Sequence, residues 1–149
     1  MADLWKEFEQ NPITHSACHH LLAISVLLQR QGYARVSDVA RELSITRGSA
    51  SLTLKALKQR GLVDEDANRF LLLSAQGRQI ADGVRAKHAV VARFLDEVLQ
   101  VGSREAELDT CKIEHLISDE TGERLARFVE FFSADEETAR DFRRAWERL

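Results

Sequence analysis

Apolar residues recur at helical spacing along most of the chain, and glycine or capping residues separate the apolar segments. Residues 13–30 form the first long segment of this kind. Asn11 and Pro12 precede it as a cap and a first helical residue, and Gly32 follows it, so the pattern predicts one long helix. A short docking helix is predicted further upstream, on a shared apolar face formed by Leu4, Trp5 and Phe8.

The segment after Gly32 predicts a helix-turn-helix followed by a hairpin. Residues 37–43 begin with Ser37 as a cap, and residues 47–60 place apolar side chains at i, i+4 and i+7. Two short helices joined by about three residues are typical of a helix-turn-helix. Residues 62–73 contain two short apolar runs around a polar turn, which predicts a small β-hairpin, the wing.

Serine residues divide the remainder of the chain into helices. Ser74 predicts the start of a helix to about residue 99, and Ser103 predicts one through Ile117. Ser118 begins another, and Ser133 with Glu136 predicts a capping box for the last. We therefore expect a mainly α protein. A winged helix-turn-helix DNA-binding domain occupies residues 1–74 in this scheme, and an all-helical domain occupies residues 75–149.

Charge is distributed unevenly along the 149 residues, although the net charge is only −3. Residues 30–60 hold seven lysines and arginines against two acidic residues, whereas residues 89–149 hold fifteen acidic against nine basic residues. The basic segment favours nucleic-acid binding, although two solvated basic helices explain it equally well. The absence of a long apolar run and of a signal peptide predicts a cytoplasmic protein without a membrane partner.

The helix over residues 47–60 has the composition of a DNA reader. Its outward face carries Arg47, Ser51, Lys55 and Lys58, with cations for phosphates and small residues near the helix start. We expect Leu52 to pack on a neighbouring helix rather than contact a thymine methyl group. The full set of expected DNA contacts is Ser37, Thr46, Arg47, Ser49, Ser51, Lys55, Lys58 and Arg69 of the wing.

Histidine and cysteine residues cluster in a way that predicts a metal site. The sequence CKIEH places Cys111, Glu114 and His115 at i, i+3 and i+4, on one helical face and within reach of one ion. The alternative is a buried free cysteine beside a surface Glu-His pair. In HSACHH, His15 and His19 also share a face, with Cys18 beside them, whereas His20 points elsewhere.

Several stretches resemble the diphtheria toxin repressor and manganese transport regulator family. They are GYARVSDVARELSITRGSASLTLKALKQRGLV, the wing leading into LSAQGR, the Lys87-His88 pair, and CKIEHLISDETGERL. The resemblance implies a homodimer that represses metal-uptake genes by binding double-stranded operator DNA when loaded with metal. It implies the short form, without an SH3-like domain, in which residues 75–149 form the dimerisation and metal-binding domain.

The resemblance also implies a ligand set. It assigns His19, His88, Cys111, Glu114 and His115 to the metal, with a second candidate set of His15, Cys18 and Glu107. Thiolate and imidazole ligands favour Fe(II) first and Zn(II) next, with Mn(II) less favoured. We expect the metal to fix the first helix against the helical domain and so to orient the DNA-binding helices.

Two other functions compete with a metal-responsive regulator. The first is a metal-independent winged-helix regulator that senses oxidation through Cys18 and Cys111, both expected to stay reduced in the cytoplasm. The second is a metalloenzyme with Glu114 as general base. No Gly-rich loop or nucleophile constellation supports it, so we expect neither an enzyme nor a small-molecule substrate.

Overall fold

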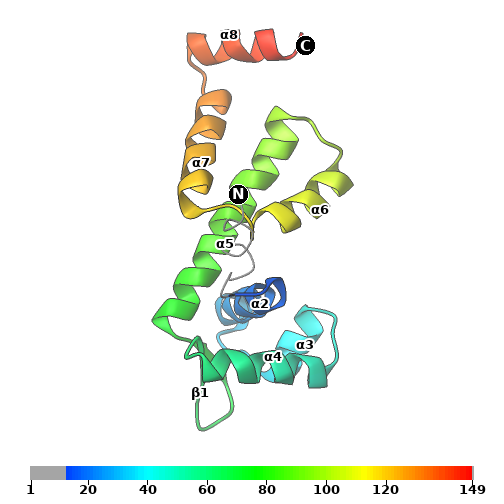
Figure 1. The fold of residues 1–149 in the computed structure, drawn as a ribbon, viewed down its shortest axis with the longest axis vertical. Coiled ribbons are helices and arrows are strands. Elements are labelled where there is room, and N and C mark those ends of the chain that lie inside the picture. Colours follow the sequence, from blue (N-terminus) through cyan, green and yellow to red (C-terminus); the bar gives the residue numbers. More distant parts are fainter. Residues whose placement is uncertain (1–12, 149) are drawn as a thin grey trace, which may run out of the picture. The chain divides into compact units, whose positions relative to one another are not determined.

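The computed structural model describes residues 13–148, in two compact units (Figure 1). The first unit ends at Asp82 and the second begins at Gly83. The predicted docking helix with Leu4, Trp5 and Phe8, and the predicted cap at Asn11, lie outside the described residues. Within the described residues, no helix is long and apolar enough to cross a membrane.

The first unit has the order of a winged helix-turn-helix. Three helices precede a two-stranded antiparallel sheet, and the start of a fourth helix closes the unit. The helices are α2 (His15–Gln31), α3 (Val36–Glu42), α4 (Arg47–Gln59) and α5 (Ala75–Arg93), and the strands are β1 (Val63–Glu65) and β2 (Leu71–Leu73).

Local capping explains where these helices begin and end. The N-cap of α2 is Thr14, whose Oγ1 accepts a bond from the backbone N–H of Ala17 at 3.2 Å. The predicted Gly32 end is confirmed, because Gly32 adopts the left-handed conformation with φ 80°. The Ser37 cap is wrong. Helix α3 begins one residue earlier, and the Asp38 carboxylate accepts the backbone N–H of Arg35 at 3.1 Å instead.

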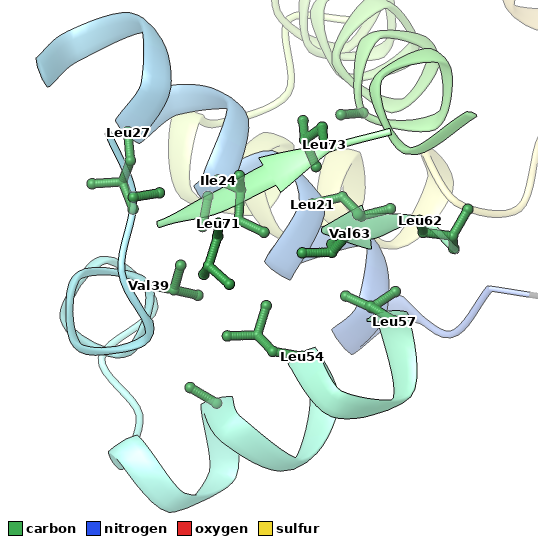
Figure 2. Packing of buried hydrophobic residues seen from close by; sticks show 14 of the residues in the cluster. Leu21, Ile24, Leu27, Val39, Leu54, Leu57, Leu62, Val63, Leu71 and Leu73 are labelled. Atoms are coloured by element: carbon green, nitrogen blue, oxygen red, sulfur yellow. The ribbon is translucent and has the colours of Figure 1, made fainter. Parts of the chain in front are cut away.

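The core of the first unit joins all of its elements (Figure 2). Leu21, Ile24 and Leu27 line one face of α2, at the i, i+3 and i+6 spacing of a helix. Each fully buried side chain of this size contributes roughly 1.5–3 kcal/mol. The partners that face them come from α3, α4, both strands and the turn before β1: Val39, Leu54, Leu57, Leu62, Val63, Leu71 and Leu73.

The wing is attached to the helices on two sides. In the hairpin, Val63 pairs with Leu73 and Glu65 pairs with Leu71. The backbone N–H of Leu71 also donates to the carbonyl of Ala34 at 2.8 Å, just before α3. At the other end, the carbonyl of Leu62 accepts the backbone N–H of Ser74 at 3.1 Å. The predicted Ser74 cap is confirmed, since its Oγ accepts the N–H of Gly77 at 3.1 Å.

The second unit is helical throughout its described part. It contains the remainder of α5, a π-helical turn, and three further helices around a core that includes Val91, Val129 and Phe132. The elements after α5 are η1 (Phe94–Val98), α6 (Ser103–Ile113), α7 (Asp119–Ser133) and α8 (Glu137–Trp146).

Two helix ends in this unit differ from the prediction. Helix α6 ends at Ile113 rather than Ile117, because the chain turns sharply toward the Ser118 cap of α7. Ser133 is the last residue of α7 and does not cap α8, whose N-cap is Glu136. The predicted domain boundary at residue 74 lies at the start of α5, whereas the boundary between the two compact units lies two turns further along this helix.

Candidate metal centre and nucleic-acid interface

Helix α4 turns its polar face toward a groove of the first unit. Ala50, Leu54 and Leu57 anchor its inner face in the core, and the Oγ1 of Thr46 accepts the backbone N–H of Ser49 at 3.1 Å to fix its start. The outward face lines a groove of about 650 Å³ together with residues from α3 and the wing. The polar residues of this groove are Arg35, Ser37, Arg47, Ser51, Lys55, Lys58, Glu65, Asn68 and Arg69.

The side chain of Asp66 caps the tip of the wing, in addition to two backbone hydrogen bonds across the turn. The Asp66 Oδ1 accepts the backbone N–H groups of Asn68 at 2.9 Å and Phe70 at 2.8 Å. Between them, Arg69 adopts a positive φ of 63°, which is uncommon for a residue with a side chain. Arg69 therefore lines the groove from a tight, side-chain-capped turn.

Charge in the groove is strongly positive, but its cations differ in what they contact. The groove holds five lysine or arginine side chains and only one carboxylate, Glu65. Glu65 forms an ion pair with Lys58. The Arg35 guanidinium lies 4.8 Å from the centre of the Phe70 ring, a cation–π distance. No carboxylate among residues 13–148 pairs with Lys55. A concave, basic, serine-lined surface of this kind fits a phosphate backbone and base edges.

The predicted DNA contacts divide into two groups. Six line the groove, whereas Thr46 and Ser49 are exposed and take part in the α4 cap. Arg35 and Asn68 also line the groove, but the sequence analysis did not include them among the expected DNA contacts. For Arg35, the only sequence signal is its position directly before the first helix of the helix-turn-helix. The packing expected for Leu52 is wrong, because 74% of Leu52 is exposed on α4.

Glu114 is the centre of a donor cluster in the second unit. Only 1% of this residue is exposed, yet it carries a carboxylate. Its Oε2 lies 2.5 Å from the Nδ1 of His88 on α5, and its Oε1 lies 2.9 Å from the Nε2 of His115. No lysine or arginine among the described residues forms an ion pair with Glu114. Burial of an anion between two imidazoles fits a site that a cation completes.

The early end of α6 shapes this cluster. Cys111 lies in the last helical turn, and Glu114 is the C-cap, with its N–H still bonded to the carbonyl of Thr110 at 2.9 Å. His115 follows in the turn, and one of its ring nitrogens lies within 4.8 Å of the Cys111 Sγ. His115 thus lies near both the Cys111 thiol and the Glu114 carboxylate, and donors of these three kinds are ones that a divalent transition metal accepts.

The surroundings of the Cys111 thiol favour its protonated form. Burial raises the pKa of this thiol above its ordinary value, and the negative charges of Glu114 and Glu107 raise it further. A metal must therefore displace the proton to gain a thiolate ligand. Glu107 and His88 also line a cavity of about 370 Å³ beside the buried Thr110, so Glu107 lies near His88 within this unit.

The histidines of α2 separate into two environments. His15 and His19 face each other, with their Nε2 atoms 3.1 Å apart. His20 is buried, and its Nδ1 lies 2.6 Å from the carbonyl oxygen of Ser16. Cys18 is also buried, whereas His15 is exposed. The geometry thus pairs His15 with His19 and leaves Cys18 on the inner face, in contrast to the predicted set of His15, Cys18 and Glu107.

The chain is similar to several known proteins. The sequence model described as "Iron dependent repressor, metal binding and dimerisation domain" matches residues 74–143, which include the Glu114 cluster. The transcriptional regulator MntR of Geobacillus kaustophilus (strain HTA426) is 29% identical over 123 residues, 83% of this chain and 86% of that protein.

Solved structures resemble the chain as well. The manganese regulator SloR is 26% identical with a TM-score of 0.69, over 76% of this chain and 53% of SloR. The IdeR structure from T. acidophilum has 22% identity and a TM-score of 0.64, over 80% of this chain and 55% of IdeR. The chain thus aligns with about half the length of these two proteins. The relatives named here are transcriptional regulators, and the chain is similar to the diphtheria toxin repressor and manganese transport regulator family.

Proposed function

We propose that the chain is a metal-responsive transcriptional repressor in which His88, Cys111, Glu114 and His115 bind the metal. The observation that carries this proposal is the buried Glu114 carboxylate between two imidazoles, inside the segment that matches a metal-binding domain. A bound metal would provide the positive charge that no lysine or arginine of the described residues brings to this carboxylate. Cys111 would release its proton when it binds the metal. The prediction that His19 adds a ligand from α2 is part of the same proposal.

The donor set favours Fe(II) first and Zn(II) next. Cys111 offers a soft sulfur and two histidines offer nitrogen, while Glu114 is the one firm carboxylate. Mn(II) prefers an oxygen-rich shell and is therefore the weaker candidate. The relatives include a manganese regulator and a structure with bound Zn²⁺, so the family accommodates more than one ion.

The metal-loaded protein would bind operator DNA as a homodimer. The recognition helices α4 of two copies would enter successive major grooves about 34 Å apart. Exposed aromatic side chains in the second unit support self-association. Phe131 is 37% exposed and Phe142 40% exposed, whereas the neighbouring Phe132 is buried in the core of the unit. Sedimentation at micromolar concentration should therefore give twice the 16.9 kDa chain mass.

Replacement of the buried carboxylate tests the metal site. Glu114→Gln keeps the shape of the side chain but removes the charge, so metal-dependent operator binding should be lost while the dimer stays folded. Glu105→Gln is the matched control, because it removes an exposed carboxylate of the same helix. Fluorescence anisotropy with and without Fe(II) or Zn(II), under anaerobic conditions, measures the effect. Full metal-dependent binding by Glu114→Gln would refute the proposal.

The oxidation-sensing alternative has less physical support. A redox-sensing cysteine needs an accessible thiolate, and thiolates form where the pKa is lowered. The pKa of Cys111 is raised instead, and Cys18 is buried in the first unit. Peroxide should therefore change operator binding less than a metal chelator does.

A further inference from the structure

The ring of Phe70 connects the wing to the chain segment before α3. The backbone N–H of Leu71 donates to the carbonyl of Ala34 at 2.8 Å, so Phe70 and Arg35 each stand next to one end of the same hydrogen bond. The centre of the Phe70 ring lies 5.4 Å from that of Tyr33 and 4.8 Å from the Arg35 guanidinium. We call these three side chains the Arg35 stack.

Backbone hydrogen bonds fix both partners of the cation–π contact in this stack. The Asp38 carboxylate accepts the N–H of Arg35 at 3.1 Å, and the Oδ1 of Asp66 accepts the N–H of Phe70 at 2.8 Å. The ring face then restricts where the guanidinium can lie. A long side chain that is restricted in the free protein loses less entropy when it binds a ligand.

The guanidinium of Arg35 is available for an anionic ligand. It lines the groove of about 650 Å³ beside α4, and no carboxylate among residues 13–148 forms an ion pair with it, since Asp38 pairs with Arg41. The planar fork of N–H donors in a guanidinium matches two oxygens of a phosphate. When a helix-turn-helix docks on DNA, its first helix crosses the phosphate backbone. Arg35 directly precedes that helix, which places it beside the backbone rather than over the base edges.

We propose that Arg35 binds a phosphate of the DNA backbone, and that Phe70 is a positioning residue that holds its guanidinium over the groove. This inference rests on the proposed function as a DNA-binding regulator. Arg35→Ala should lower the slope of log affinity against log salt by about 1.8 in a dimer, because each phosphate contact contributes about 0.9. Phe70→Leu keeps an apolar side chain but removes the ring face, so it should weaken binding about two- to tenfold per subunit.

A double-mutant cycle separates positioning from a merely structural role of the ring. The full chain, with Zn(II) in excess, is titrated into a fluorescent DNA duplex of mixed sequence, and anisotropy is followed at several salt concentrations. If Phe70 acts through Arg35, Phe70→Leu should weaken binding less than about twofold once Arg35 is already alanine. Arg60→Ala is the control, because it removes an exposed arginine that does not line the groove, and it should leave the slope unchanged.

The proposal is overturned if Arg35→Ala leaves the salt slope unchanged, or if Phe70→Leu weakens binding equally with and without Arg35. A stack that only attaches the wing would give the first of these results, together with a lower free energy of unfolding of Arg35→Ala in urea. Failure of the proposed repressor function is a different result: the affinity of the wild-type chain for DNA would not respond to metal. The comparison among variants at one metal concentration does not depend on that response.

Discussion

Glu65 should limit how strongly the DNA groove responds to salt. Lys58 and Lys55 both line the groove, but Lys58 is paired with Glu65 and Lys55 has no carboxylate partner among residues 13–148. A cation already neutralised by a carboxylate releases fewer DNA counterions when it meets a phosphate. The structure therefore predicts that Lys55 contributes more than Lys58 to the salt dependence of DNA binding.

The size of the effect follows from counterion release. Each phosphate contact contributes about 0.9 to the slope of log affinity against log salt, which is about 3.5-fold in affinity between about 50 and about 200 mM. In a dimer, Lys55→Ala should reduce the slope by about 1.8, which is about twelvefold over the same range. Glu65→Gln releases Lys58, so it should tighten binding at low salt and steepen the slope by up to about 1.8.

Anisotropy titrations of an operator duplex at four or five salt concentrations, with metal in excess, measure these slopes. Asp64→Asn is the matched control, because it removes the same charge from an exposed position of β1 that does not line the groove. The reasoning fails if Glu65→Gln leaves the slope unchanged and Lys58→Ala lowers it as much as Lys55→Ala. Lys58 would then contact phosphate despite its ion pair.

Three further predictions concern stability, sequence preference and pH. Gly77→Ala should lower the free energy of unfolding by roughly 1–3 kcal/mol in urea melts, because a Cβ there would overlap the carbonyl oxygen of Leu62. Gly83→Ala is the control on the same helix: a Cβ there meets open space, so this change should be neutral or stabilising. The exposed Leu52 side chain can contact thymine methyl groups. Leu52→Ala should therefore weaken binding of thymine-rich operators about fourfold for each methyl group that the shorter side chain no longer reaches. Competition with variant duplexes measures this effect, and affinity for operators with cytosine in place of thymine should stay unchanged. The raised pKa of Cys111 means that the folded chain keeps this proton to higher pH than the unfolded chain. The free energy of unfolding of the metal-free protein should therefore fall as pH rises above about 9, and Cys111→Ser should flatten that decline in a pH series of urea melts.

Periodicity and caps were sufficient for most of the first unit. Ser74 and, in the second unit, Ser118 stand where a capping side chain and a following helical pattern agree, and both begin helices in the structure. The start of α2 was harder, since Asn11 and Thr14 are both good caps three residues apart. His20 was predictable in retrospect, because it shares the i, i+4 and i+7 positions of Ile24 and Leu27 on the buried face.

The metal cluster was only partly predictable. The CKIEH spacing identified its donors, but the burial of Glu114 depends on His88, which is 26 positions away along the chain. The end of α6 at Ile113 has no glycine or proline to indicate it. Similarly, no local pattern shows that Lys58 meets Glu65, because that ion pair needs the wing to fold back beside α4.

The attachment of the wing to α5 has a practical consequence for dividing the chain. Ala81 is fully buried and Ile80 packs on the core of the first unit, although both lie beyond residue 74. A fragment ending at residue 74 would lose these side chains and the Gly77 bond to the Ser74 Oγ, and would expose the apolar surface that they cover. A DNA-binding fragment that folds by itself must therefore extend at least to Asp82.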